Sequence, residues 1–180
     1  MVDSAGKKKQ KIVVTDELSE SVLSVRRVTK VIRGGRRFAF SALVVVGDKQ
    51  GKVGVALGKG REVSSAIAKA LRRARKCMVN IPLYKTTIPF AVEGKHGASK
   101  VVIRSASKGT GVIAGGAVRA VMEALGVHDI LAKSLGSANS QNVVKATFNA
   151  LAKLRSARDL ARMRGKTIQE ICGVQNVAVK

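Results

Sequence analysis

The sequence is poor in several residue types on which particular protein classes depend. Its 180 residues include 2 Cys, 2 His, 2 Pro and no Trp. The two thiols, Cys77 and Cys172, lie far apart, and neither belongs to a Cys-x-x-Cys pair. This excludes a disulfide framework and a zinc site and indicates a reducing compartment. The 18 Gly follow no period and accompany little proline, which excludes a collagen-like or low-complexity chain.

Long apolar runs are also missing. The longest ones, such as Ala42–Val46, fall far short of the roughly 18 to 20 residues that span a bilayer. No long apolar stretch follows the lysines near the N-terminus, so we expect no secretory signal. The pattern therefore predicts neither a membrane protein nor a secreted one.

Acidic residues are the third deficit. The chain has 11 Asp+Glu against 34 Lys+Arg, a net charge of +23. Because 46% of its residues are hydrophobic, it can bury a core and is not a disordered basic tail. Charge of this size opposes compaction unless a polyanion neutralises it. Nucleic acid is the first expectation, ahead of an acidic membrane surface or a protein partner.

The excess charge is concentrated in one stretch. Residues 26–76 hold 15 basic and 2 acidic residues, a net charge of +13, whereas residues 1–25 are neutral overall. The remaining residues, 77–180, carry +10. The polyanion is therefore expected to meet the N-terminal half of the chain.

Hydrophobic periodicity predicts an α+β protein in which residues 16–80 form a first unit of the order α-β-β-β-α. The expected elements are a short helix over 16–23, strands over 25–32, 38–46 and 52–57, and a helix from about 61 to 78. Gly34-Gly35 and the stretch Gly47–Gly51 mark the turns. Residues 1–15 are predicted to be a disordered basic extension.

Residues 81–157 are predicted to form a second αβ unit after a linker at Ile81–Leu83. The expected elements are strands over 86–92, 100–104 and 127–135, a helix ending near 125, and a helix capped by Asn139 or Ser140. In the tail, residues 158–180, the sequence from Thr167 to Glu170 is a capping box for a short last helix.

Two groups of residues suit contact with phosphate. Six basic residues within twelve positions surround Gly34 and Gly35, and four more share one face of the helix over 61–78. With two lysines of the third strand, the predicted RNA-binding residues are Arg26, Arg27, Thr29, Lys30, Arg33, Gly34, Gly35, Arg36, Arg37, Lys52, Lys59, Lys69, Arg72, Arg73 and Lys76. We expect Phe38 and Phe40 to pack in the core, so the predicted mode is phosphate and ribose contact with structured RNA.

A glycine-rich segment, Gly109-x-Gly111-x-x-x-Gly115-Gly116, leads into a predicted helix, with Asp129 further on. The pattern is similar to a dinucleotide-binding loop, but too little chain follows to complete a doubly wound sheet. A tight strand-to-helix turn is the favoured interpretation.

Nothing in the sequence marks a catalytic or metal site. His96 and His128 have no partners at ligand spacing, and Cys77 is expected to be a core thiol. Nucleophile, zinc-protease and P-loop motifs are missing. We therefore expect no enzyme, no cofactor, no metal and no small-molecule substrate.

Several motifs together resemble the family of the fifth small-subunit ribosomal protein, in its bacterial or organellar form. The first is Thr29–Phe38, followed by Val45–Asp48 and Gly58–Val63, and the second is Gly109–Val121. The segments Asn142–Thr147 and Arg164–Ile171 extend the resemblance, which covers roughly residues 17–173.

The resemblance implies a fold and a set of partners. It implies an N-terminal unit similar to a double-stranded-RNA-binding domain and a C-terminal two-layer αβ domain. It further implies binding to small-subunit ribosomal RNA and to the fourth and eighth small-subunit proteins. The location implied is a ribosome in the cytoplasm or an organelle, near the side where mRNA enters and the decoding region, with an influence on accuracy.

The resemblance also implies roles for particular residues. A spectinomycin-proximal loop corresponds to Thr29, Lys30, Arg33, Gly34 and Gly35. A contact with the fourth protein corresponds to Gly109, Thr110, Gly111 and Arg119. Two alternatives stay open: a free double-stranded-RNA or chromosomal nucleic-acid-binding protein, and, more distantly, a nucleotide-using enzyme built on the C-terminal fold.

Overall fold

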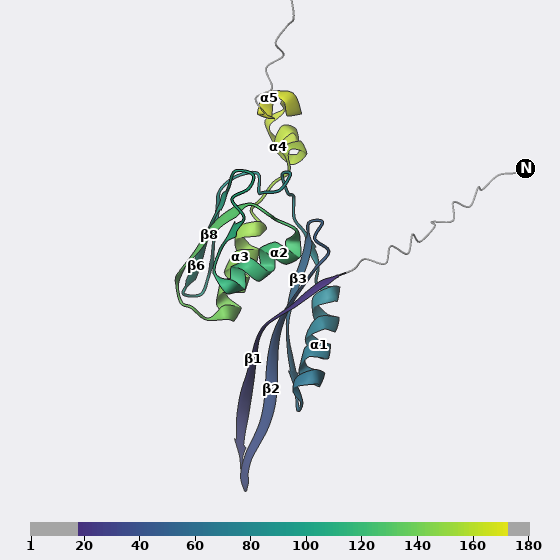
Figure 1. The fold of residues 1–180 in the computed structure, drawn as a ribbon, viewed down its shortest axis with the longest axis vertical. Coiled ribbons are helices and arrows are strands. Elements are labelled where there is room, and N and C mark those ends of the chain that lie inside the picture. The colour runs from purple at the N-terminus through teal and green to yellow at the C-terminus, as the bar shows by residue number, and fades with distance from the viewer. Residues whose placement is uncertain (1–17, 173–180) are drawn as a thin grey trace, which may run out of the picture.

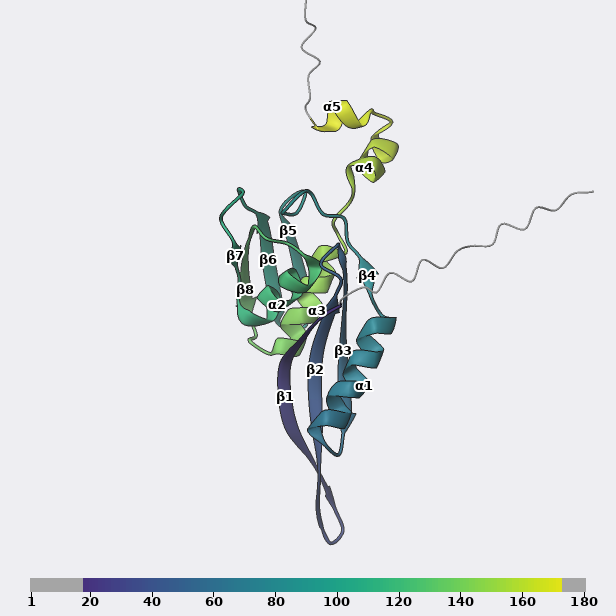
Figure 2. The ribbon, with the colours of Figure 1, turned by 45° about the vertical axis from the view of Figure 1, so that its right-hand side comes forward.

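The computed structural model describes residues 18–172 and stacks four layers. Helix α1 covers one side of a first sheet, helices α2 and α3 lie on its other side, and a second sheet closes the far side of these two helices (Figures 1 and 2). The mixed α+β class predicted from periodicity is confirmed. None of the helices between residues 18 and 172 is both long and apolar enough to cross a bilayer.

The first sheet is antiparallel, with strands in the order β1-β2-β3-β4. Its strands are β1 (Ser19–Ile32), β2 (Gly35–Gly47), β3 (Lys52–Gly60) and β4 (Val79–Asn80). The predicted turn at Gly34-Gly35 is present, because both glycines take positive φ angles, +90° and +147°, that side chains rarely adopt. In the second turn, the Asp48 carboxylate accepts hydrogen bonds from the amides of Gln50 and Lys52, at 2.8 and 2.9 Å.

The prediction of a helix over residues 16–23 is wrong for residues 18–23, the part that the structure describes. Strand β1 begins at Ser19, and Glu20 pairs with Val46 of β2 and forms an ion pair with Arg75 of α1. Long-range pairing with an apolar strand therefore overrides the local helical signal of the acidic run. Asp16, Glu17 and the extension 1–15 lie outside the described residues.

Helix α1 (Val63–Lys76) packs on the sheet through alanines four residues apart, Ala66, Ala70 and Ala74, all fully buried. A Cβ added at Gly58 of β3 would overlap the Ala66 carbonyl oxygen, so the helix lies very close to the strand. Cys77 follows the last helical residue and is exposed. The expectation of a core thiol is therefore wrong, because the buried stripe of α1 ends at Ala74.

The second sheet has the strand order β5-β6-β8-β7, in which only β7 and β8 run parallel. Its elements, in chain order, are β5 (Val92–His96), β6 (Ser99–Ser105), β7 (Val112–Ile113), α2 (Gly116–Leu125), β8 (Ile130–Gly136) and α3 (Ser140–Leu151). Asn139 caps α3 as expected, accepting a hydrogen bond from the Gln141 amide at 3.3 Å.

The strand predicted over residues 86–92 is wrong. Apart from one isolated bridge between Tyr84 and Thr87, this segment is irregular until β5 starts at Val92. Pro89 has no N–H for a ladder, and the carbonyl of Thr86 accepts from the amides of His128 and Asp129. Because these two amides are bonded to Thr86, β8 begins only at Ile130, three residues later than expected from the sequence.

Two short helices follow α3. Helix α4 (Ala157–Arg164), which sequence patterning missed, is capped by Ser156, whose hydroxyl accepts from the Asp159 amide at 3.1 Å. Helix α5 (Ile168–Cys172) confirms the predicted short last helix, and the Glu170 amide donates to the Thr167 hydroxyl at 3.4 Å.

The two halves of the chain share one apolar core. Leu43, Val45 and Val53 of the first sheet pack in the same buried cluster as Val121 of α2 and Ile103 of the second sheet. Backbone hydrogen bonds reinforce the junction, since Lys49 donates to Ala124 at 3.0 Å and Gly51 donates to Leu125 at 3.1 Å.

The junction requires glycine at Gly47, where an added Cβ would overlap the carbonyl group of Ala124. Gly47→Ala is therefore expected to lower the free energy of unfolding by about 1 to 3 kcal/mol, as overpacked sites do. Gly116→Ala is the control, because a Cβ there meets nothing within 4 Å. Chemical denaturation should show a loss for the first variant and none for the second; equal stabilities would contradict the close approach.

Candidate nucleic-acid interface

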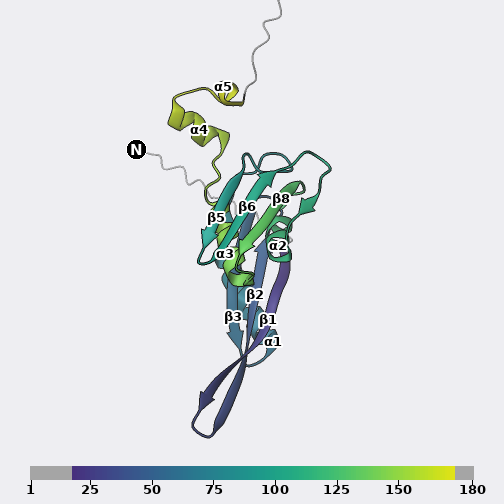
Figure 3. The ribbon, with the colours of Figure 1, turned by 90° about the vertical axis from the view of Figure 1, so that its left-hand side faces the viewer.

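The β1–β2 hairpin projects well beyond the helices, at the opposite end of the molecule from α4 and α5 (Figures 1 and 3). Every residue from Val25 to Ile32 is exposed, and no acidic residue occurs between Ser21 and Gly47. Strand-forming valines and backbone pairing down to Ile32 and Gly35 build the hairpin, and no core supports its tip. It presents cations without local counter-charges.

The register distributes these cations over both faces of the hairpin. On what we term the Arg27 face, which continues onto the side covered by α1, Arg27 lies opposite Phe40 and Thr29 opposite Phe38. On the other, the Arg26 face, Arg26 lies opposite Ser41 and Lys30 directly opposite Arg37. Like charges placed opposite each other destabilise a strand pair, so this pattern does not serve the stability of the hairpin.

The third strand extends the Arg26 face. Lys59 of β3 pairs with Ser41, the same residue that lies opposite Arg26 on the other side. Lys52, by contrast, lies at the opposite end of β3, beside Asn80 of β4. The structure therefore groups Lys59 with the hairpin and leaves Lys52 apart from it.

The four predicted basic residues of α1, Lys69, Arg72, Arg73 and Lys76, are all exposed. Arg73 is also anchored, because its guanidinium donates to the carbonyl oxygen of Leu57 at 3.2 Å. Since α1 packs on the same sheet that continues into the hairpin, both basic groups belong to one αβ layer.

The two phenylalanines of β2 differ in their surroundings. Phe40 is half-buried against the apolar cluster beneath α1, as expected from the sequence. Phe38 is 51% exposed, and the Arg27 guanidinium lies 4.7 Å from its ring centre. The expectation of a core position is wrong for Phe38, because it lies two residues beyond the point where the cover of α1 ends.

The glycine-rich segment forms a tight turn stabilised by one buried carboxylate. Gly109 and Gly111 have φ angles of +93° and +75°, and a Cβ at either would meet nothing within 4 Å. Conformation, not close packing, is thus the reason for glycine there. Their amides donate to one oxygen of Asp129, at 2.9 and 3.1 Å.

Asp129 is only 4% exposed and is held in its charged form. Hydrogen bonds from the Gly111 amide, the Thr86 side chain and the Gly109 amide lower the pKa of Asp129 from its ordinary value of 3.8. Because both glycine amides point at this carboxylate, they are not directed at a phosphate. Asp129, which follows the glycine-rich segment in the sequence, orders the loop instead.

Arg119 lies on the exposed side of α2, and its guanidinium donates to the carbonyl oxygen of Val112 at 3.1 Å. Gly111 accepts a backbone hydrogen bond from Ile130 at 3.1 Å, directly before β7. Loop, edge strand and helix thus form one ordered surface that includes Gly109, Thr110, Gly111 and Arg119.

Comparison with known proteins assigns both halves of the chain. Residues 18–82 match the family model described as "Ribosomal protein S5, N-terminal domain", and residues 94–164 match "Ribosomal protein S5, C-terminal domain". The chain belongs to the ribosomal protein S5 family. This confirms the resemblance of the sequence motifs to that family.

Close relatives of this S5-family chain cover most of its length, and all three named here are called "Small ribosomal subunit protein uS5". The protein of Gluconacetobacter diazotrophicus is 52% identical over 164 residues, which are 91% of this chain and 85% of that protein. That of Flavobacterium psychrophilum is 54% identical over 155 residues, 86% of this chain and 89% of its own. That of Rickettsia typhi is 55% identical over 157 residues, 87% and 90% respectively.

S5 membership accounts for the lack of catalytic motifs, because the family consists of structural ribosomal proteins and not of enzymes. Within residues 18–172, His, Cys, Asp and Glu form no group of three that could hold a metal ion.

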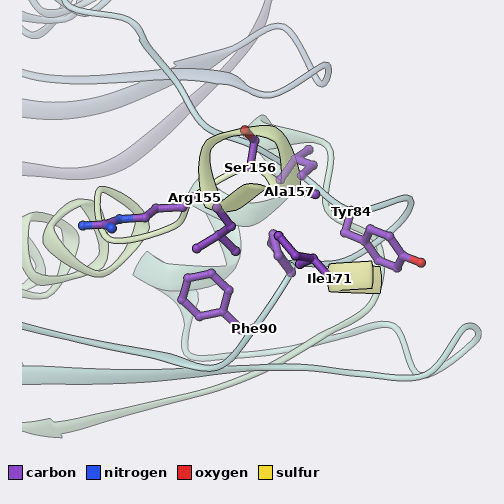
Figure 4. A pocket seen from close by; sticks show the side chains of 9 residues that line it. Tyr84, Phe90, Arg155, Ser156, Ala157 and Ile171 are labelled. Carbon is purple, nitrogen blue, oxygen red and sulfur yellow. The ribbon is translucent and has the colours of Figure 1, made fainter. Parts of the chain in front are cut away.

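One pocket of this S5-family chain was missed by sequence reasoning, because helix α4 was not predicted. It has a volume of about 410 Å³ and lies between α4, α5 and the irregular segment that contains Tyr84 and Phe90 (Figure 4). Its lining is mostly apolar, and the Arg155 guanidinium beside it donates to the sulfur of Met163 at 3.0 Å. Its lining residues include no histidine, cysteine or carboxylate.

The loop of this S5-family chain should loosen when the Asp129 carboxylate loses its charge. Because the folded-state pKa is depressed, the stabilisation is present above pH 3.8 and is lost as pH falls through the lower folded-state pKa. Asp129→Asn should reduce hydrogen-exchange protection of the Gly109 and Gly111 amides at neutral pH.

Asp159→Asn is the matched control, because Asp159 also has a lowered pKa but its carboxylate accepts a hydrogen bond from Ser156, the N-cap of helix α4. It should leave the protection of both glycine amides unchanged. Full protection in Asp129→Asn would show that the loop is ordered by something else.

Proposed function

We propose that this S5-family chain, as a structural constituent of the small ribosomal subunit, binds small-subunit ribosomal RNA through the β1–β2 hairpin and helix α1. One observation carries the proposal: an exposed hairpin with six cations between Arg26 and Arg37 and no acidic residue from Ser21 to Gly47. Repulsion such as that between Lys30 and Arg37 is relieved when phosphates approach.

The first unit, residues 16–80, is proposed to engage RNA in the manner of a double-stranded-RNA-binding domain. Its described part has the order β-β-β-α-β, with the short strand β4 last and without the first helix of the predicted α-β-β-β-α unit. Such domains contact phosphates and ribose across successive grooves. Cations lie on both faces of the hairpin, at Lys59 of β3 and along α1. This wide distribution supports contact with structured RNA.

The second unit, residues 81–157, is proposed to be a two-layer αβ domain that meets the fourth and eighth small-subunit proteins. The ordered surface of Gly109, Thr110, Gly111 and Arg119 is the proposed contact with the fourth protein, and the tail, residues 158–180, follows it. Thr29, Lys30, Arg33, Gly34 and Gly35 form the proposed spectinomycin-proximal loop. The proposed place is near entering mRNA and the decoding region, in a cytoplasmic or organellar ribosome, where the chain supports accuracy.

Replacing two cations of the hairpin should weaken the salt dependence of RNA binding. With about six phosphate contacts, log Kobs against log salt should have a slope near −5 for the unaltered chain. Arg33→Ala combined with Arg36→Ala should flatten this slope by about one to two units in binding to a small-subunit ribosomal RNA transcript.

The charge-matched control is Lys95→Ala combined with Lys145→Ala, because both lysines are exposed on the second unit. It should keep the original slope. A slope that the hairpin variant leaves unchanged would remove the hairpin from the RNA interface.

Reversing the charge of Arg119 should affect protein contacts more than RNA contacts. Arg119→Glu loses the hydrogen bond to Val112 and places an anion on the proposed contact surface. Association with the purified fourth small-subunit protein should fall at least tenfold, while affinity for the RNA transcript changes little. Lys145→Glu on α3 is the control; a large loss of RNA affinity confined to Arg119→Glu would argue against the assignment.

A further inference from the structure

We infer that Phe38 is a stacking platform for an RNA base, with Arg27 bound to the ring as its cationic partner. The inference rests on the proposed RNA-binding function and adds a contact of a different kind to it. Phosphate and ribose contacts are made by charged and polar groups, whereas this site would receive an unpaired nucleobase.

Phe38 is 51% exposed, although transfer of an aromatic side chain from water is strongly favourable. A buried position is available two residues along the same face, where Phe40 packs against the apolar cluster under α1. An exposed aromatic on a projecting strand contributes little to folding, so its contribution lies in a contact outside the chain.

The Arg27 guanidinium lies 4.7 Å from the centre of the Phe38 ring. This distance lies within the range of a favourable cation–π contact. The contact restricts the ring and places a positive charge over one of its faces. A base that stacks on the exposed part of the ring would therefore find its phosphate near Arg27 and near Arg36, two residues before Phe38 on the same face.

The chemistry around the ring of Phe38 selects the kind of partner that can bind there. The ring lies in a hairpin without an acidic residue, so a partner that combines a flat apolar surface with negative charge fits it. A nucleotide has both properties. Base–aromatic stacking adds roughly 1 to 3 kcal/mol per base and tolerates any sequence, which corresponds to roughly 5- to 150-fold in affinity.

The test compares a short oligoadenylate with an abasic oligonucleotide of the same length and charge, each titrated with the full chain. The unaltered protein should bind the oligoadenylate at least fivefold more tightly than the abasic strand. Phe38→Leu should remove this preference without changing the salt slope, and Phe38→Tyr should retain it. Val31→Ala is the control, because Val31 is also an exposed apolar residue on the Arg27 face.

The outcomes separate this inference from the proposed function. An undiminished preference for bases in Phe38→Leu, with normal salt-dependent binding to the ribosomal RNA transcript, would overturn the stacking site alone. If Phe38→Leu keeps the preference but fails to join the small subunit, the ring contacts a protein and the inference is equally overturned. If the unaltered protein shows no salt-dependent binding to the ribosomal RNA transcript, the proposed function itself is overturned.

Discussion

The packing of α2 between the two sheets is the contact on which the rest of the architecture depends. At its centre the backbone of Gly47 lies against Ala124, and Lys49 and Gly51 donate hydrogen bonds to the last turn of α2. The two halves therefore share a core and a backbone junction. Because the hairpin continues the same strands that enter this junction, its base is held by the buried core although its tip has none.

This anchoring explains how the hairpin can carry so many cations. A free two-stranded ribbon with Lys30 opposite Arg37 would be disfavoured by repulsion, and only the anchored strands β1 and β2 keep it formed. The second half needs no such concentration of cations, because its glycine loop is ordered by a buried carboxylate, Asp129. One half of the chain thus offers concentrated charge, and the other offers a preorganised surface in a part of the chain where cations are sparser.

Sequence patterning predicted those elements whose signals are local and strong. The alternation from Phe38 to Val46 and the cap at Asn139 are examples. It failed where tertiary contacts decide the outcome: the acidic run near Glu20 joins a strand because β2 and Arg75 are available, and Ile88 is buried in a segment without regular pairing.

The same distinction applies to the proposed RNA interface. The basic residues of the hairpin were recognised from composition, since charge density needs no structure to be seen. The exposure of Phe38 was not, because it depends on where α1 ends above β2. Asp129 was noticed for its spacing from the glycines, but only the folded chain shows that its carboxylate accepts the amides of Gly109 and Gly111.

The central claim is that the basic hairpin serves a permanent place in the small ribosomal subunit and not transient binding to free nucleic acid. Sedimentation of the endogenous protein in high salt tests it most directly, because salt releases proteins held by phosphate contacts alone. The account predicts that the protein co-migrates with small subunits, retained by RNA and neighbouring proteins together. Migration as free protein, or with double-stranded RNA or chromosomal material, would contradict it.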